Sequence, residues 1–145
     1  MPAHFRAVCS RVIDGDTIEL AGGERVRYIG IDAPEMRPVQ AWAEAATEAN
    51  RELVEGRGVL LELDAQERDR YGRLLAYVYV DGLFVNAEMV RRGYAQVSTY
   101  PPNVRHQDSL LAAEGAARAA GCGLWSPGTA APGAPLPAAA PTAGE

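Results

Sequence analysis

Short runs of β-branched and aromatic residues dominate the first third of the chain. They span Phe5–Ile13, Thr17–Leu20 and Arg25–Ile31, with Asp14-Gly15-Asp16 and Gly22-Gly23 between them. Residues of these types favour strands, and paired glycines favour a tight hairpin turn. The pattern therefore predicts three consecutive strands joined by short turns.

The next segment changes from the period of a strand to that of a helix. Its apolar positions recur at helical spacing: Trp42, Ala45, Ala46, Ala49 and Leu53. Such spacing gives an amphipathic helix one apolar face, and a glycine commonly ends a helix. We expect a helix over 40–55 that stops at Gly56 and packs one face on the sheet.

The second half of the chain predicts two more strands and two more helices. Val59–Leu63 and Leu74–Val80 have strand character, and Asp81-Gly82 supplies a turn after the second. A short helix is expected to take Asn86 as its N-cap and to end at Gly93, because Asn commonly caps helices. A last helix should cover about 107–120. Leu110 and Leu111 in this helix, and Trp125 after it, are expected to be packing residues.

Five strands with three helices inserted and appended predict a small closed barrel, an α+β fold that is mainly β. The order is compatible with the five-stranded oligonucleotide or oligosaccharide barrel, the OB-fold. Residues 1–126 should form this unit. The remainder, 127–145, is rich in Ala, Pro and Gly and predicts a disordered tail.

Length and cysteine usage narrow the class of protein. A chain of 145 residues can bury a core without disulfide staples. Cys9 and Cys122 are too few and too far apart for a disulfide framework or a Cys-rich zinc site, although one disulfide between them stays open. The sequence also has no apolar run of membrane-spanning length, and its first nine residues do not resemble a signal peptide.

The charge of the chain constrains how it could bind a polyanion. All 14 basic residues are Arg, and 19 acidic residues give a formal net charge of −5. Non-specific nucleic-acid binding usually requires a basic face. Any phosphate chemistry must therefore depend on locally placed arginines.

Three polar clusters interrupt the strand pattern: Asp14-Gly15-Asp16-Thr17, Asp32-Ala33-Pro34-Glu35 and Arg68–Arg73. Carboxylates from separate segments can form a hard-cation site if the fold brings them together. Pro34 should stiffen the backbone of the second cluster. A stiff segment would hold its polar groups in fixed relative positions, which suits a metal ligand beside a general base. The alternative interpretation is ordinary turn and strand-exit chemistry for the first two clusters and a charged hairpin surface for the third.

Strand alternation places a condition on any site that contains both Arg27 and Asp32. Residues five positions apart on a regular strand point to opposite faces. If both side chains act on one phosphate, the strand must bend between them, and Gly30 is the natural place. Arg27 and Arg73 both suit phosphate, because a guanidinium can donate two hydrogen bonds and stays charged.

From about Val12 to Trp125 the chain resembles the staphylococcal nuclease (thermonuclease) family. The stretches that carry the resemblance are 12–17 (VIDGDT), 27–35 (RYIGIDAPE), 69–77 (DRYGRLLAY), Val85-Asn86 and 124–126 (LWS). Several such stretches in one order are far more specific than any one alone. The resemblance implies an OB-fold barrel and Ca²⁺-dependent hydrolysis of DNA and RNA to 5′-hydroxyl and 3′-phosphate ends.

The resemblance also implies roles for individual residues. Asp16 and Asp32 match carboxylate ligands of Ca²⁺, Ala33 matches a backbone-carbonyl ligand, and Asp14 matches a supporting acid. Glu35 matches the general base. The remaining matches are to residues that bind the scissile phosphate or the nucleotide: Arg27, Arg73, Arg70, Tyr71 and Tyr100. His4 and His106 match no catalytic position and are expected at the surface or at a helix start.

Two alternatives to a nuclease stay open on the sequence. One is a non-catalytic OB-fold module that binds nucleic acid, and the other is an oligosaccharide-binding or protein-interaction barrel. For the nuclease, the acidic surface predicts weak binding to long duplex DNA, so we expect single-stranded or denatured DNA and RNA as the substrate. We also expect a monomer with no membrane partner. The dependence on Ca²⁺ favours a secreted or periplasmic location, with the cytoplasm as the alternative.

Overall fold

The computed structural model describes residues 4–36 and 40–127. Five strands form its barrel: β1 His4–Asp14, β2 Thr17–Leu20, β3 Arg25–Tyr28, β5 Gly58–Glu62 and β6 Leu74–Val80. β1 is long enough to pair with β2 through one half and with β5 through the other. Register shifts at Cys9/Arg11 and Val12/Asp14 interrupt the regular pairing of β1 with β2.

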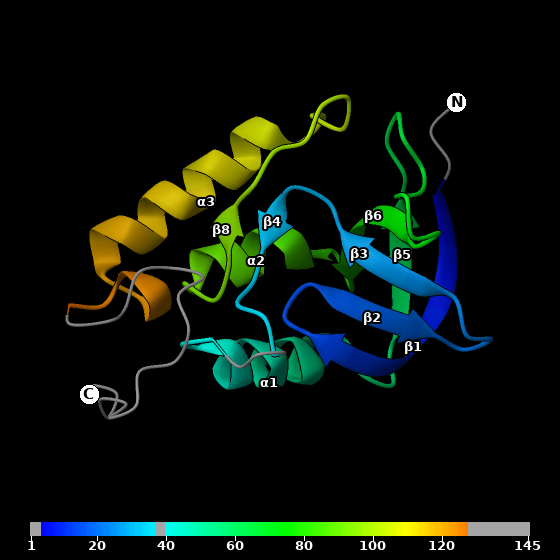
Figure 1. Ribbon diagram of the computed structural model, residues 1–145, viewed down its shortest axis with the longest axis horizontal. Helices are drawn as coiled ribbons and strands as arrows, with labels where there is room; N and C mark the ends of the chain where they lie inside the picture. The colour runs from blue at the N-terminus through cyan, green and yellow to red at the C-terminus, as the bar shows by residue number, and fades with distance from the viewer. Residues whose placement is uncertain (1–3, 37–39, 128–145) are drawn as a thin grey trace.

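The sheet closes on itself through a parallel pairing between β3 and β6. Neighbouring strands run in the order β3-β2-β1-β5-β6, and Val26 of β3 then lies opposite Leu74 of β6. Figure 1 shows this barrel at the right, with the helices to its left and below it. The closed five-stranded barrel with three helices is an OB-fold and is mainly β, as the sequence predicted.

The helices and short strands surround one end of the barrel. The helices are α1 Ala43–Val54, α2 Val85–Arg91 and α3 Gln107–Ala120, followed by the 3₁₀ turn η1 Gly123–Trp125. The short strands are β4 Ile31–Asp32, β7 Leu83–Phe84 and β8 Gln96–Val97, of which β4 pairs with β8. α1 packs on β1, and α2 packs between α3 and β6 (Figure 1).

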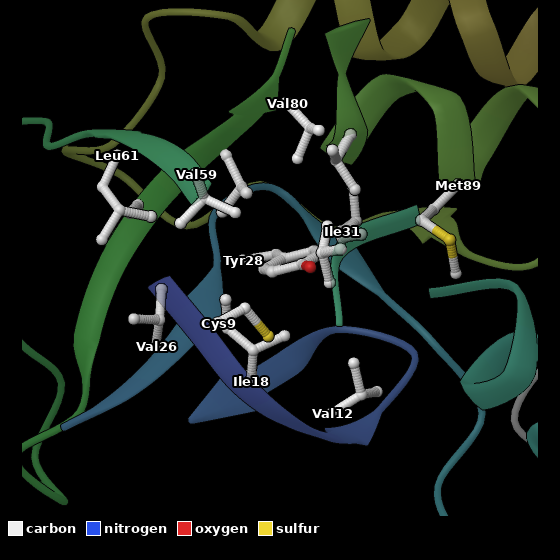
Figure 2. Packing of buried hydrophobic residues seen from close by; sticks show 14 of the residues in the cluster. Cys9, Val12, Ile18, Val26, Tyr28, Ile31, Val59, Leu61, Val80 and Met89 are labelled. Atoms are coloured by element: carbon white, nitrogen blue, oxygen red, sulfur yellow. The ribbon is translucent and has the colours of Figure 1, made fainter. Parts of the chain in front are cut away.

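The core fills the barrel and extends toward the helices. Figure 2 shows the Tyr28 ring surrounded by aliphatic side chains such as Ile18, Val59 and Val80, with Met89 of α2 nearby. Tyr28 is 1% exposed. Its hydroxyl must therefore find a partner inside the protein, because an unpaired buried hydroxyl is costly.

The segment expected as one strand over Arg25–Ile31 is divided into two. β3 ends at Tyr28, Gly30 has a φ of +83°, and β4 begins at Ile31. The bend lies where the sequence predicted it. A Cβ on Gly30 would lie only 2.5 Å from Leu110 Cδ1, so Gly30 is required both for its backbone angle and for its close contact with α3.

Three details of the sequence prediction are wrong. Asn86 is not an N-cap: α2 starts at Val85, and the buried Asn86 amide bonds to the Val78 N–H and the Ile29 carbonyl. The first helix starts at Ala43 rather than at residue 40, because Trp42 has a left-handed backbone (φ 71°). Leu111 is 45% exposed, since α3 buries only one narrow face.

Cys9 and Cys122 are both free thiols, so the disulfide left open by the sequence is not formed between them. Within the described residues, each helix is too short or too polar to span a bilayer. The predicted tail lies outside the described residues, apart from Pro127.

Candidate active site

The turn between β1 and β2 carries the first acidic cluster. Asp16 is 5% exposed, and its Oδ2 accepts a hydrogen bond from the Ala33 N–H over 2.8 Å. Its Oδ1 accepts from the Thr17 hydroxyl over 3.1 Å. Asp14 Oδ1 accepts from the Asp16 N–H over 3.0 Å. These bonds hold the Asp16 carboxylate beside the Asp32-Ala33 segment.

The bend at Gly30 brings Arg27 into the same cluster. Arg27 Nη1 donates to the carbonyls of Tyr28 and Ile31, each over 2.8 Å. Arg27 Nη2 lies 3.3 Å from Asp32 Oδ1 and 3.4 Å from Asp16 Oδ2. A carboxylate from the β1–β2 turn and one from β4 therefore converge on one guanidinium nitrogen.

Barrel closure brings Arg73 to the same region. Arg73 immediately precedes β6, whose parallel pairing with β3 sets Arg27 opposite Leu75. Arg73 Nε donates to Asp69 Oδ2 over 2.7 Å, and Asp69 Oδ1 accepts from the Arg73 N–H over 3.0 Å. Burial alone would raise the pKa of Asp69, but these hydrogen bonds outweigh it and hold the pKa below its ordinary value.

One cleft gathers these groups. Its lining residues are Ile13, Asp14, Asp16, Thr17, Arg27, Asp32, Ala33, Glu35, Met36 and Arg73. A carboxylate cluster and two arginines thus share one concave surface. The arrangement can hold a cation and an anionic oxygen side by side, as phosphoryl chemistry requires.

A second cleft adjoins the first and shares Arg27 and Arg73 with it. It also includes Arg70, Tyr71 and Tyr100. Both tyrosines are exposed, at 69% and 70%, so they form the rim of this cleft rather than part of the core. The Arg70 and Arg73 guanidiniums lie 5.0 and 5.6 Å from the centre of the Tyr71 ring. An aromatic rim beside arginines suits a nucleobase and its phosphate.

Glu35 lines the first cleft and is exposed. Its N–H donates to Gln40 Oε1 over 2.7 Å, and its carbonyl accepts from the Gln40 N–H over 2.9 Å. Gln40 therefore fixes the backbone beneath Glu35 while the carboxylate stays accessible to water.

The electrostatics of the cleft favour a bound cation. Burial and the neighbouring Asp16 raise the pKa of Asp14 to about 7. Burial also raises the pKa of Asp32, against the opposing effect of the Arg27 guanidinium. The carboxylates are thus crowded and partly desolvated, a state that a cation would relieve.

The donor atoms fit a hard cation such as Ca²⁺. The Asp16 and Asp32 carboxylates converge on Arg27 Nη2, and Ala33, whose N–H bonds to Asp16, lines the same cleft. Oxygen-only donors match the preference of Ca²⁺. Among residues 4–36 and 40–127, no cluster of three or more Asp, Glu, His or Cys side chains has a metal-binding arrangement.

The structure brings every site residue expected from the sequence to these two clefts. Sequence reasoning missed three residues whose side chains form hydrogen bonds with cleft-lining residues: Gln40 with Glu35, Asn50 with Asp14, and Asp69 with Arg73. Asn50 was detectable in principle, because it lies four residues after Ala46, on the helix face predicted to be apolar. A polar residue at such a position requires an internal partner.

Comparison with known proteins agrees with this geometry. Residues 25–127 match the family model described as staphylococcal nuclease homologue. The chain is 41% identical over 125 residues to the endonuclease YncB and 40% identical over 125 residues to the SPbeta prophage-derived endonuclease YokF, both of Bacillus subtilis. Each match covers 80% of this chain, but only 59% of YncB and 42% of YokF.

A third relative is covered over more of its own length. The thermonuclease of Staphylococcus intermedius is 36% identical over 122 residues, which is 79% of this chain and 73% of the relative. The family match begins at β3 and includes Arg27, Asp32–Glu35 and Arg73 of the first cleft, whereas the turn with Asp14 and Asp16 precedes it. This chain belongs to the staphylococcal nuclease family.

Proposed function

We propose that this protein is a Ca²⁺-dependent nuclease that hydrolyses phosphodiester bonds of DNA and RNA to 5′-hydroxyl and 3′-phosphate products. The observation that carries the proposal is the convergence of Asp16, Asp32 and Arg27 in a cleft that Arg73 also lines. The names of the relatives, endonuclease and thermonuclease, support the same reaction class.

In this proposal Asp16, Asp32 and the Ala33 carbonyl hold Ca²⁺, which would offset negative charge on the phosphate and orient a water molecule. Arg27 and Arg73 bind the non-bridging phosphate oxygens through their guanidiniums. Displacement at phosphorus accumulates negative charge on those oxygens, so two preorganised cations lower the barrier. Arg27 is well placed for this role because two backbone carbonyls already orient its Nη1.

Glu35 is the proposed general base. Its exposed carboxylate accepts a proton from the attacking water, whose oxygen bonds to phosphorus as the bond from phosphorus to the 5′ oxygen breaks. The leaving 5′ oxygen takes up a proton from solvent water and becomes the 5′-hydroxyl. Gln40 holds the Glu35 backbone through two hydrogen bonds, which keeps this carboxylate at the cleft.

Arg70, Tyr71 and Tyr100 form the proposed nucleotide-binding rim. Tyr71 and Tyr100 offer ring faces on which an unpaired base can stack, and Arg70 can bind a flanking phosphate. An unpaired base is required for such stacking, and the net charge of −5 opposes capture of long duplexes. Single-stranded or denatured nucleic acid is therefore the proposed substrate of a monomeric enzyme.

The experiment that tests the function is incubation with denatured DNA and with RNA, in Ca²⁺ and in a chelator, followed by end-group analysis. We expect Ca²⁺-dependent cleavage with 5′-hydroxyl and 3′-phosphate ends. Binding without cleavage in Ca²⁺ would instead support the non-catalytic OB-fold module. Ends with 5′-phosphates would contradict the proposed bond cleavage.

The proposal extends to the site of action. Free Ca²⁺ is much scarcer in the cytosol than outside the cell, and an enzyme that depends on it should act outside the cytosol. We expect the full-length protein in the secreted or periplasmic fraction, and cell fractionation with an antibody to this barrel checks it. Recovery only with cytosolic markers would contradict this part of the proposal.

A further inference from the structure

Asn50 is a polar side chain in the interior of the protein that none of the proposed chemical steps uses. It lies on α1 and is 0% exposed. Its neighbours on the buried face of the helix include Ala46, Ala49 and Val54. A fully buried amide is tolerated only when its donor and acceptor are both paired.

Both ends of the Asn50 amide are paired, and each partner residue lines one of the two clefts. The Tyr28 hydroxyl donates to Asn50 Oδ1 over 2.7 Å, and Asn50 Nδ2 donates to the Asp14 carbonyl over 2.9 Å. A carbonyl can only accept, so the amide nitrogen must face Asp14 and the amide oxygen must face Tyr28. The buried Tyr28 hydroxyl thus has the internal partner it needs.

The loop held by Asn50 is the one that carries the acidic cluster. Asp14 Oδ1 accepts from the Asp16 N–H, and Asp16 in turn accepts from the Ala33 N–H. Gly15 lies against α1 so closely that a Cβ there would be 2.7 Å from Ala33 Cβ and 2.9 Å from Ala46 Cβ. Helix α1 therefore constrains this loop through a side-chain bond from Asn50 and through contact with Ala46.

We propose that Asn50 is a positioning residue that holds the Asp14-Gly15-Asp16 loop so that its carboxylates face the cleft. Asn50 lines neither cleft and acts through the Asp14 carbonyl. Tyr28 orients the amide and links the loop to the strand that carries Arg27. The inference deepens the proposed function, because the loop that it positions supplies a proposed Ca²⁺ ligand.

Asn50→Leu is the central variant, since it keeps a similar volume and removes both hydrogen bonds. Tyr28→Phe removes only the bond that orients the amide. Thr47→Val is the matched control, because Thr47 is also buried on α1 but its hydroxyl donates to the Ala43 carbonyl of the same helix. Thr47 makes no hydrogen bond to the acidic loop among the described residues.

The first readout needs neither Ca²⁺ nor substrate. Amide hydrogen exchange in the metal-free protein should be at least about tenfold faster at Asp16 in Asn50→Leu, while exchange at Val12 in β1 stays within about twofold, because only local opening changes. Thr47→Val should leave both rates unchanged. Unchanged exchange at Asp16 in a folded Asn50→Leu protein would overturn the proposal, and so would equal acceleration in Thr47→Val.

The second readout is Ca²⁺ affinity, measured by titration calorimetry. Residues that orient metal ligands typically contribute about 10- to 100-fold in affinity, so we expect a loss in that range for Asn50→Leu. Tyr28→Phe should show a smaller loss and Thr47→Val none. A wild-type Ca²⁺ affinity in Asn50→Leu would overturn the positioning role.

The test of Asn50 can fail or succeed independently of the test of the proposed function. If the wild-type protein binds no Ca²⁺ and cuts no nucleic acid, the proposed function fails, whereas the exchange measurement still decides whether Asn50 holds the loop. If Asn50→Leu does not fold, Asn50→Ser replaces it, because Ser is too short to bridge Tyr28 and Asp14. The same exchange difference at Asp16 then supports or overturns the proposal.

Discussion

Arg27 donates to Asp32 across a bend that a regular strand would not contain: Arg27 Nη2 lies 3.3 Å from Asp32 Oδ1. The two residues are five positions apart and would point to opposite faces of an unbroken strand. The left-handed backbone of Gly30 (φ +83°) ends β3 and turns the chain into β4. This local break is the condition for a site that contains both side chains.

Replacement of Gly30 tests the importance of this bend for stability. Gly30→Ala adds a Cβ 2.5 Å from Leu110 Cδ1 at a left-handed backbone position. Gly56→Ala is the matched control, because Gly56 also has a left-handed backbone (φ +78°) but no heavy atom within 4 Å of the added Cβ. The control should lower the free energy of unfolding by about 1–2 kcal/mol.

Gly30→Ala should cost a further amount, about 1–3 kcal/mol, because overpacking adds to the backbone strain. Denaturant titration of both variants measures the difference. Equal losses in the two variants would show that the contact with Leu110 relaxes without cost and would contradict this prediction.

Arg73 should matter to the rate at least as much as Glu35. Cationic contacts to a transferring phosphoryl group are worth about 10³–10⁵ in rate, whereas general-base assistance is worth about 10²–10⁴. We therefore expect Arg73→Ala to reduce kcat/KM on denatured DNA at least as much as Glu35→Gln. Arg57→Ala, an exposed arginine outside both clefts, is the control for lost positive charge. Near-wild-type kinetics for Arg73→Ala would reject this order.

Asp69 should act on catalysis only through Arg73. Asp69→Asn removes the charge that holds Arg73 Nε at 2.7 Å, and misplacement of a substrate-binding group by about 1 Å can cost about 100-fold. We expect a 10- to 100-fold loss of kcat/KM, with little change for Glu67→Gln in the same loop.

A double-mutant cycle distinguishes this positioning role from an independent one. If Asp69 works only by orienting Arg73, then Asp69→Asn should cost almost nothing once Arg73 is already Ala. Additive losses in the double variant would mean that Asp69 has another role, such as positioning the Tyr71 backbone. Asp69 Oδ1 accepts a hydrogen bond from the Tyr71 N–H over 2.9 Å.

Glu62 should make the stability of the barrel depend on acid pH. Burial acts to raise the pKa of Glu62, but hydrogen bonds from His106, Tyr79 and Arg105 lower it below the ordinary 4.5. Because the pKa is depressed in the folded state, the stabilisation is complete above about pH 4.5 and is lost as the pH falls through the folded-state value.

Replacement of this carboxylate should therefore weaken the pH dependence. Glu62→Gln should be less stable than wild type at neutral pH, and the difference should shrink below pH 4.5. Denaturant titrations across this range, with the exposed Glu52→Gln as control, measure it. A stability difference that stays constant down to low pH would contradict the sign of the shift.

The sequence by itself determined the local elements and the chemical types of the site. β2 and β6 were predicted at their observed bounds, and the bend at Gly30 followed from alternation of a strand. These features depend on interactions among near neighbours in the chain, such as side-chain periodicity and backbone restriction by Gly and Pro. The carboxylates and arginines could be proposed as site residues for the same reason, because each lies in a short motif that is visible in the sequence.

Only the tertiary structure decided which of these groups meet and what holds them. The parallel pairing of β3 with β6 brings Arg73 to the cleft of Arg27, and α1 places Asn50 against the Asp14 carbonyl. Asn86 was misassigned because a local cap and a buried bridge to Ile29 look alike in sequence. Contacts between distant segments depend on the closed barrel, in which burial forces each polar group to find a partner that local sequence does not specify.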